Sequence, residues 1–360
     1  PGMRGFDDRI LNGHLYLNGV EVEDPSEIER RMGVFKPRIG AVLHDWPNFY
    51  AAVFEESDKL VGELEALDFS NLIELESDEA MKDLLHLYPM TQVYRDYLKM
   101  WDILVRMGQH TLKALLPSYA GYLVYMDKVR TLFPGIPDKA LTQMVQGFES
   151  KLFRPVEELQ NLAHAAVELG VTGPLLDLPR WEQAKAALEQ TENGRGWLER
   201  FEATRDPWFE MTNGEGWQKQ SLAWNDDLDV PLVSIRNYIA ALQAGETIQR
   251  PKEAVFEERD RVTAEYRALI PNEEDAAGFD GLIQMTRALA PASEDHNFYH
   301  GSLFHSLYDR KMRQLGGLLT RMGILGESED VFLLKRGELD SAVWETYTAW
   351  ARGRVPAGHY

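Results

Sequence analysis

Apolar residues recur at every third or fourth position along most of the chain, which is the spacing of one buried face of a helix. The segment RPVEELQNLAHAAVELG, residues 154–170, is typical. Proline suits the first turn of a helix and glycine its end, so Pro155 and Gly170 mark the limits of this one. The apolar face between them consists of Leu159, Leu162, Ala166 and Leu169.

The same spacing predicts further helices. Asp24 is placed to cap a helix that begins with Pro25, and Glu27 suits a capping box. The segments 93–116 and 293–323 continue the helical rhythm over several turns. A last helix carries an apolar face made of Leu339, Val343, Tyr347 and Trp350.

Strand patterns are few and short. HLYLNGVEVE, from His14, predicts a β-hairpin whose turn is Asn18–Gly19. DVFLL, residues 330–334, predicts either a brief buried strand or an extended connection between helices. The aromatic, glycine-interrupted segment 194–224 predicts the longest irregular loop, and long ordered loops are often functional.

These patterns predict a mostly α fold. We expect a multi-helix domain with a short β-hairpin near the N-terminus and little other strand. Residues 1–30 would form the hairpin segment, and residues 31–360 the helical domain that binds a ligand.

Composition narrows the possible partners. The 360 residues carry a formal net charge of −20, so the chain should be repelled by nucleic acid and by anionic membranes. No cysteine is present, which excludes disulfides, thiolate catalysis and cysteine-ligated metals. No apolar run has the length of a membrane span, and no signal peptide is recognisable, so we expect a cytoplasmic protein.

Several well-known catalytic motifs are missing. The sequence contains no G-x-x-x-x-G-K-[ST], no H-E-x-x-H and no G-x-S-x-G. These absences count against a P-loop nucleotide enzyme, a zinc peptidase of that type and a serine hydrolase. An enzyme with a less regular site is still compatible with the sequence.

Three of the nine histidines fall within SEDHNFYHGSLFHSLYDRKMRQLGG. On a helix that starts near Ser293, His296 and His300 are four residues apart and share a face, as two metal ligands would. His305 lies nine residues after His296, about half a turn around the axis at roughly 100° per residue. The three imidazoles therefore cannot converge on one ion from this helix alone, and we predict no metal site.

An acid–base role asks for less, because one imidazole beside a carboxylate can take a proton from a hydroxyl group. His296 is the candidate, with Glu294 or Asp295 to tune it and with Asn297 and Tyr299 to supply directional hydrogen bonds. The alternative is that the Ser-Glu-Asp run before it only caps a helix, and that the histidines are packing or surface residues.

Two other segments combine aromatic and acidic residues. DPWFEM (206–211) and SLAWNDDLDVP (221–231) contain Trp208, Trp224 and Asp227. Aromatic walls with a few polar groups describe a small-molecule pocket. A loop pinned to the core by tryptophan, with solvated aspartates, would explain the same residues.

Three arginines could meet an anionic group. Arg287, Arg310 and Arg313 could clamp a phosphate through bidentate hydrogen bonds. Helical arginines in an acidic protein more commonly pair with surface carboxylates, so both interpretations stay open.

The middle of the chain resembles a known enzyme family. The segments GFESKLFRPVEELQNLAHAAVELG, WNDDLDVPLVSIRNYI, ERDRVTAEYRALIP and EDHNFYHGSLFHSLYDRKMRQLGGLLTRMGILGESEDVFLLKRGEL are similar to the middle region of phosphoenolpyruvate-utilising enzymes. They resemble the rifampin phosphotransferase and phenylphosphate synthase type in particular. The best part of the match is GILGESEDVFLLKRGEL, and the resemblance covers about Gly19 to Leu339.

The resemblance implies a phosphoryl relay. In such enzymes an ATP-grasp domain phosphorylates a histidine on a swivelling domain, which carries the phosphoryl group to an acceptor held by a third domain. The glycine-rich ATP-grasp signature and the carrier histidine are missing from this sequence. We therefore expect an acceptor-binding domain, excised or a subunit of a split enzyme, that is inactive with ATP on its own. ATP and Mg²⁺ are implied for the complete enzyme, with no cofactor bound by this chain.

These expectations assign roles to ten residues. The acceptor would be a small aromatic alcohol, and the partners of this chain would be the ATP-grasp and phosphohistidine domains or subunits. The expected catalytic residues are His296, Glu294 and Arg287, with Arg287 meeting the phosphoryl group. The expected acceptor-binding residues are Asn297, Tyr299, His300, His305, Trp208, Trp224 and Asp227. The alternatives are a non-catalytic helical interaction protein and a metal-dependent enzyme in its own right.

Overall fold

The computed structural model describes residues 2–11, 14–69, 87–211 and 222–351. The predicted fold class is confirmed: these residues form helices and a single two-stranded antiparallel sheet near the N-terminus. Within the same residues, no helix combines the length and the apolar character that a bilayer span requires.

The N-terminal hairpin pairs β1 (Met3–Leu11) with β2 (His14–Glu21). The predicted turn was wrong, because Asn18 lies inside β2, opposite Asp7. Leu11 pairs with His14, and residues 12 and 13 between them lie outside the described residues. Those two residues are a second Asn-Gly pair in the sequence, and the strand pattern alone did not distinguish the two pairs.

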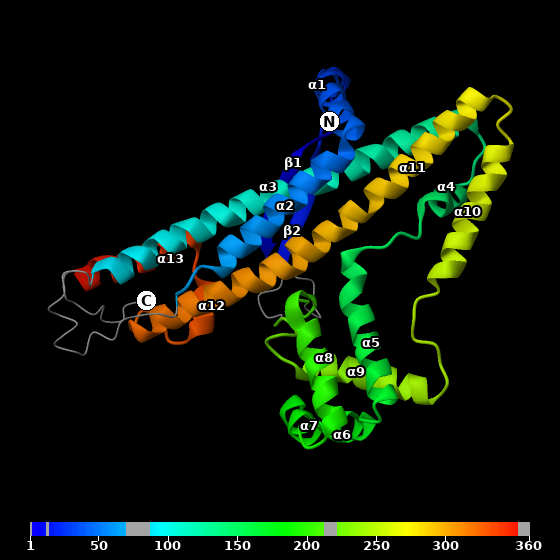
Figure 1. The fold of residues 1–360 in the computed structure, drawn as a ribbon. Helices are drawn as coiled ribbons and strands as arrows, with labels where there is room; N and C mark the ends of the chain where they lie inside the picture. Colours follow the sequence, from blue (N-terminus) through cyan, green and yellow to red (C-terminus); the bar gives the residue numbers. More distant parts are fainter. Residues whose placement is uncertain (1, 12–13, 70–86, 212–221, 352–360) are drawn as a thin grey trace.

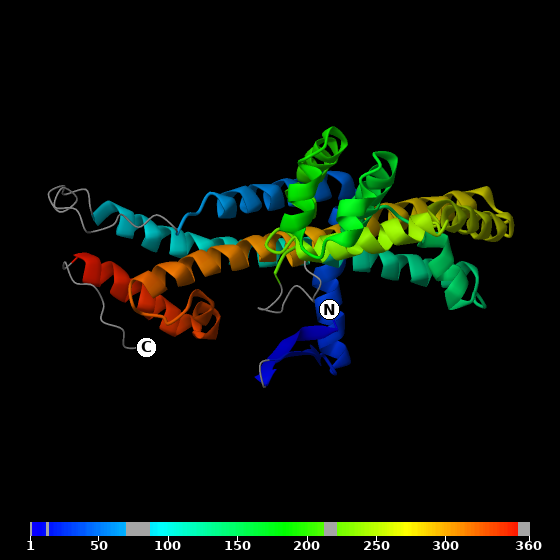
Figure 2. The ribbon, with the colours of Figure 1, turned by 90° about the horizontal axis from the view of Figure 1, so that it is seen from below.

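Long helices running side by side form what we call the body (Figures 1 and 2). It contains α2 (Trp46–Glu65), α3 (Leu87–Leu132), α11 (Glu273–His296) and α12 (His305–Arg321), with the π-helix η4 (Asn297–Phe304) joining the last two. The body's main core is built from apolar residues of α2, α3, η4 and α12. It includes Leu60, Met100, Ile103, Phe304 and Leu315, each at most 1% exposed.

Within the described residues, four further helices pack on the body. α1 (Pro25–His44) crosses the long helices, and the predicted cap is confirmed, since Asp24 accepts a hydrogen bond from the Ser26 amide at 2.9 Å. α4 (Asp138–Val145) and α10 (Lys252–Ala268) pack at one end, and α13 (Arg336–Ala351) packs on α3. The segment 330–334, for which a short strand or an extended connection was predicted, lies mostly in the 3₁₀-helix η5 (Ser328–Leu333).

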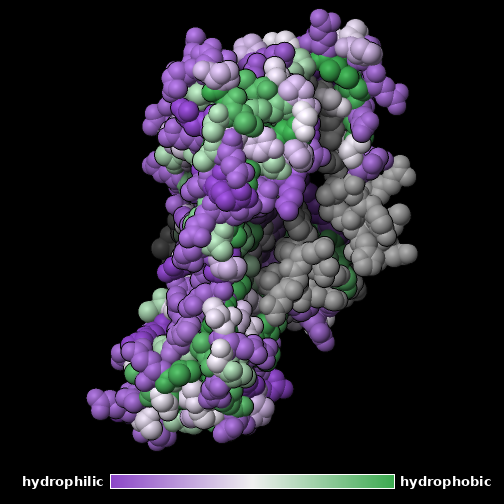
Figure 3. Space-filling view, turned by 90° about the vertical axis from the view of Figure 1, so that its right-hand side faces the viewer, coloured by the Kyte–Doolittle hydropathy of each residue, from purple (hydrophilic) through white to green (hydrophobic). Residues whose placement is uncertain are grey.

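Residues 151–211 and 222–243 form a separate lobe that we call the arm, at the bottom of Figures 1 and 3. It contains η3 (Lys151–Phe153), α5 (Arg154–Glu168), α6 (Thr172–Asp177), α7 (Trp181–Leu188), α8 (Glu192–Trp208) and α9 (Asp229–Gln243). The arm has its own core, in which Trp181 stacks on Phe201 at a centroid distance of 4.1 Å. The predicted helix after Pro155 is confirmed as α5.

The loop predicted over 194–224 was wrong in its first half, because α8 continues to Trp208. Gly194, at the start of the predicted loop, lies inside α8 and is required by close packing. A Cβ atom at this position would lie 2.0 Å from the carbonyl oxygen of Leu188. Residues 212–221 of the predicted loop lie outside the described residues.

Candidate functional site

The histidine-rich segment lies where α11 passes into α12 through the π-helix η4. The helix predicted to start near Ser293 was wrong, since α11 begins twenty residues earlier at Glu273. The Ser293 hydroxyl donates to the Ala290 carbonyl at 3.0 Å inside that helix instead of capping a new one. π-Helical turns are uncommon and often mark functional positions.

His300 lies at the centre of a buried polar cluster between three helices. Its Nδ1 is 2.8 Å from Oγ1 of Thr111 on α3, and its Nε2 is 3.2 Å from Oγ of Ser57 on α2. We call His110, His296, His300 and His305, together with Ser57 and Thr111, the histidine layer. His300 is 3% exposed, so these hydroxyl groups replace water as its hydrogen-bonding partners.

The distances assign a tautomer to His300. Ser57 donates to the Val53 carbonyl at 2.9 Å, whereas the Thr111 hydroxyl is nearer to the ring than to the Met107 carbonyl, at 2.8 Å against 3.2 Å. Thr111 therefore donates to Nδ1, and Nε2–H of His300 donates to Ser57. This arrangement needs a neutral ring. Burial and, to a smaller extent, the charges of the nearby histidines lower the pKa of His300 to about 3.

His296 has one ring nitrogen bonded and one available as an acceptor. Its Nδ1–H donates to the Ser293 carbonyl, which leaves Nε2 of the neutral ring with its lone pair. The residue is 8% exposed, and its ring centroid is 6.1 Å from that of His300. Burial lowers the pKa of His296, against smaller opposing effects of the Ser293 bond and of Glu294. A neutral imidazole of this kind can take a proton from a hydroxyl group.

The other two histidines of the layer are neutralised by burial as well. His305 donates from Nδ1 to the His300 carbonyl, and burial lowers its pKa. Burial, followed by the charge of Lys113, lowers the pKa of His110, which is 8% exposed. Nδ1 of His110 has no hydrogen-bond partner among the described residues, so this buried nitrogen can still accept or donate a hydrogen bond.

The layer does not form a metal centre. Within residues 2–11, 14–69, 87–211 and 222–351, no three histidine, aspartate or glutamate side chains are grouped as ligands of one ion. The hydrogen-bonding partners of the imidazoles are hydroxyl groups at His300 and backbone carbonyl groups at His296 and His305.

Other predicted residues of η4 and its flanks connect the body to the arm. Asp295 accepts from the Ser150 hydroxyl at 2.8 Å and from the Lys151 amide at 2.6 Å. The Lys151 ammonium contacts the Tyr299 hydroxyl and lies 4.4 Å from the centre of its ring. Tyr299 is buried, and its ring is 5.3 Å from that of Phe54 on α2.

Glu294 and Asn297 lie at the outer edge of the same segment. Asn297 is exposed and contacts the Glu294 carboxylate at 3.4 Å. Glu294 acts on His296 only through its charge, which raises the pKa of the imidazole slightly. Neither residue reaches the buried hydroxyl groups of the layer by a direct hydrogen bond in the structure described.

The predicted aromatic and acidic residues of the arm divide into two groups. Trp208 reaches the body, with its ring 5.2 Å from that of Phe298 on η4. Trp224 is buried inside the arm against Phe209, at a centroid distance of 5.9 Å. Asp227 is exposed and accepts from the Asp229 amide at 3.2 Å, at the start of α9. Only Trp208 of these three contacts η4.

Arg287 is fully engaged in structural contacts. Its guanidinium donates to the Met144 carbonyl at 2.8 Å, to Asp260 at 2.9 Å and to the Thr263 hydroxyl at 2.7 Å. These bonds join α11 to α4 and α10. Arg310 is engaged as well, since it donates to both carboxylate oxygens of Glu210, at 3.0 and 3.2 Å.

Sequence analysis missed three members of the layer. Ser57 and Thr111 are separated from His300 by 243 and 189 positions, and no local pattern connects them. His110 had a signal, because it falls on the same helical face as Met100, Ile103 and Met107. Those three residues are at most 2% exposed. A histidine among such residues must be buried too.

Comparison with known proteins gives two distant relatives. Over 288 residues, 72% of this chain, the sequence is 23% identical to the uncharacterized phosphotransferase YvkC of Bacillus subtilis (strain 168). Over 345 residues, 94% of this chain, it is 21% identical to chondramide synthase cmdD of Chondromyces crocatus. The chain spans 33% of the first relative and 8% of the second. No protein-family model matches the sequence.

Proposed function

We propose that this chain is the acceptor-binding part of an ATP-dependent phosphotransferase. Phosphate would pass from ATP to a phosphohistidine on another domain or subunit, and from there to the hydroxyl group of a small aromatic alcohol bound here. The observation that carries the proposal is the similarity to a phosphotransferase over 72% of this chain. The aligned region makes up a third of that relative, as expected for one part of a relay.

The histidine layer supports the chemical part of the proposal. Attack by a hydroxyl group on a phosphohistidine forms an O–P bond and breaks the P–N bond, and the hydroxyl proton must leave. His296 is neutral and has Nε2 available, so it is the proton acceptor in this proposal. The ring of His300, next to His296, is held in place by its hydrogen bonds to Ser57 and Thr111.

The contacts between arm and body support an acceptor site at η4. Trp208 of the arm and Phe54 of the body bring aromatic rings to Phe298 and Tyr299. In our proposal the acceptor lies beside these rings and directs its hydroxyl group toward the histidine layer. Arg287 is not part of this proposal, because each of its three guanidinium nitrogens already donates a hydrogen bond within the fold.

Calorimetric titration of the chain with a panel of phenols and benzylic alcohols tests the proposal. We expect binding by the wild type and about tenfold weaker binding by His296→Gln, since one hydrogen bond contributes roughly 1.4 kcal/mol. His164→Gln is the matched control, because His164 lies on α5 of the arm, hydrogen-bonded to Gln249 at 3.0 Å. No binding of any phenol or alcohol would contradict the proposal.

The second candidate function is a non-catalytic interaction protein. One specific observation favours it, namely a row of exposed apolar residues along α3. If phenols bind equally well to the wild type and to His296→Gln, the histidine layer is only a part of the core and the interaction role gains support.

A further inference from the structure

Six large apolar side chains are exposed in one line along α3. Their exposures range from 48 to 60%. Leu98, Val105, Leu112, Leu116, Tyr119 and Leu123 make up this row, which we call the α3 stripe. Monomeric proteins scatter such residues singly, whereas a continuous row on one helix indicates a surface that another helix covers.

The spacing of the stripe is that of a coiled-coil seam. Leu98, Val105, Leu112 and Tyr119 follow one another at intervals of seven residues, as do Leu116 and Leu123. Asp102 and Gln109 fill the two remaining positions, so the steps alternate between four and three residues along the whole stripe. The opposite side of α3 is buried in the body core, with Met100, Met107 and Ala114 at most 2% exposed.

We propose that the α3 stripe is the interface between two copies of this chain, with the two α3 helices antiparallel across a two-fold axis. The proposal does not rest on the phosphotransferase function. Its basis is that the alternating steps read the same in both directions, so the stripe is complementary to itself. Leu98 then meets Leu123 of the second copy, and Val105 meets Leu116, over roughly 37 Å at 1.5 Å per residue.

The polar positions of the stripe are consistent with this alignment. Asp102 falls opposite Tyr119 of the second copy, where the phenol hydroxyl can donate to the carboxylate. Gln109 falls opposite Leu112, near the two-fold axis. Arg106 flanks the seam, but Glu56 lies 2.5 Å from its guanidinium, so this edge carries little uncompensated charge.

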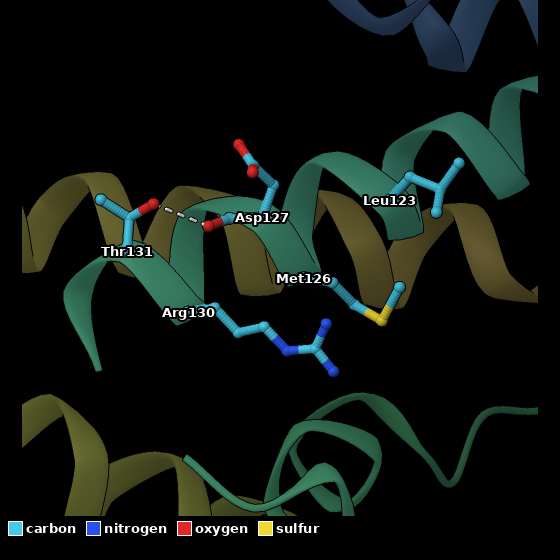
Figure 4. A pocket seen from close by; sticks show the side chains of 5 residues that line it. All are labelled: Leu123, Met126, Asp127, Arg130 and Thr131. Atoms are coloured by element: carbon cyan, nitrogen blue, oxygen red, sulfur yellow. Dashed lines mark hydrogen bonds between the residues drawn. The ribbon is translucent and has the colours of Figure 1, made fainter. Parts of the chain in front are cut away.

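One end of the stripe opens into a surface hollow of about 370 Å³ (Figure 4). Leu123 and Met126 form its apolar part, and Asp127, Arg130 and Thr131 form its polar part. In the antiparallel alignment the Leu98 side chain of the second copy lies next to Leu123 and fills the edge of this hollow. The alignment therefore supplies an apolar group where the surface has room for one.

Two properties should make the association weak and salt-dependent. One pair of helices covers less than the roughly 800 Å² per partner of a standard interface. Each copy also carries a formal charge of −20, so the copies repel each other at long range. Added salt screens this repulsion and should strengthen the dimer.

Sedimentation velocity over a range of protein concentrations tests the interface. We expect a concentration-dependent dimer for the wild type and a monomer for the double variant Leu112→Glu/Leu116→Glu, with unchanged circular dichroism. Leu269→Glu is the matched control, because Leu269 is 67% exposed outside the stripe, and it should dimerise like the wild type. A wild type that stays monomeric at every concentration and salt level would overturn the proposal.

The absence of cysteine allows a test of the orientation as well. In the antiparallel dimer, Leu98→Cys/Leu123→Cys should give disulfide-linked dimers under mild oxidation. Each single variant should stay unlinked, because residues 98 of the two copies are far apart. Cross-linking of the Leu98→Cys single variant would indicate parallel helices. No cross-linking of the double variant would show that Leu98 does not lie next to Leu123 of the second copy. Either result overturns the proposal.

Discussion

Oγ1 of Thr111 lies 2.8 Å from Nδ1 of His300 and connects the middle of α3 to the π-helical turn between α11 and α12. A π-helix has poorer backbone geometry than an α-helix, so side-chain bonds of this kind help to hold it. The histidine layer therefore has a structural role whether or not it takes part in catalysis.

Replacing Thr111 by valine should destabilise the protein by about 1–3 kcal/mol, because it leaves Nδ1 of His300 buried without a partner. Chemical denaturation of the two proteins measures the difference. Thr131→Val is the matched control, since Thr131 on the same helix bonds only to the Asp127 carbonyl at 2.9 Å and is exposed. Its effect should stay within about 0.5 kcal/mol. Equal effects at the two positions would show that the Thr111 contact contributes nothing.

Stability should fall as the pH is lowered from about 6.5 toward 3. The pKa of His300 is lowered to about 3 from an ordinary value of 6.5, so below pH 6.5 the unfolded chain binds a proton that the folded chain does not. The contribution of the neutral His300 to the free energy of unfolding is fully present above pH 6.5. It is lost on acidification, at up to about 1.4 kcal/mol per pH unit. The lowered pKa values of His296 and His305 act in the same direction.

Denaturation curves at a series of pH values check this expectation. His300→Gln should show a shallower decline than the wild type between pH 6.5 and 4, whatever its stability at neutral pH. Asp309 acts in the opposite direction, because burial raises its pKa to about 6. On acidification the folded chain therefore binds a proton at Asp309 at a higher pH than the unfolded chain does, which stabilises the fold. Asp309→Asn should therefore steepen the decline. Parallel curves for wild type and His300→Gln would contradict the assigned neutral state.

The sequence predicted the helices well and the histidine layer only in part. Helical periodicity and caps such as Asp24 are local signals, so α1 and α5 could be predicted from neighbouring residues. Contacts between distant segments leave no such signal. Ser57 and Thr111 could not be assigned to His300, because each is an ordinary polar residue on its own helix.

The errors have the same physical origin. Gly194 resembles a helix breaker in sequence, and only the Leu188 carbonyl beside it shows that close packing requires the glycine. The Ser-Glu-Asp run at 293–295 resembles a helix cap, although it lies inside α11. Arg287 is a different case, because each of its guanidinium nitrogens donates a hydrogen bond within the fold, and its contact with a phosphoryl group stays a prediction.

The ion pair between Arg310 and Glu210 should matter for stability because it joins the body to the arm. Glu210 is 6% exposed and also accepts from Asn225 at 2.8 Å. Arg310→Met should cost about 2–4 kcal/mol, because it leaves a buried carboxylate without its cation. The double variant Arg310→Met/Glu210→Gln should recover part of this loss.

Arg261→Met is the control for that experiment. Arg261 pairs with Glu258 and Glu265 on the surface of α10, and its side chain is 55% exposed. Exposed pairs of this kind contribute about 0–1 kcal/mol. Thermal denaturation of the wild type and the three variants separates the two cases, and a loss for Arg310→Met no larger than that for Arg261→Met would show that the arm is not held by this pair.

The connection between α4 and the arm should tolerate no side chain at Gly147. This residue has a φ of +73°, and an added Cβ would lie 2.8 Å from Val255 and 3.1 Å from Phe256. Gly147→Ala should therefore destabilise the protein by about 1–3 kcal/mol, from backbone strain together with the contact.

Gly278→Ala should have the opposite effect, because Gly278 is exposed in the interior of α11 with nothing within 4 Å of an added Cβ. There the change should stabilise by about 0.5–1 kcal/mol through helix propensity. Denaturation of both variants measures the contrast, and equal signs would contradict the packing of the arm connection against α10.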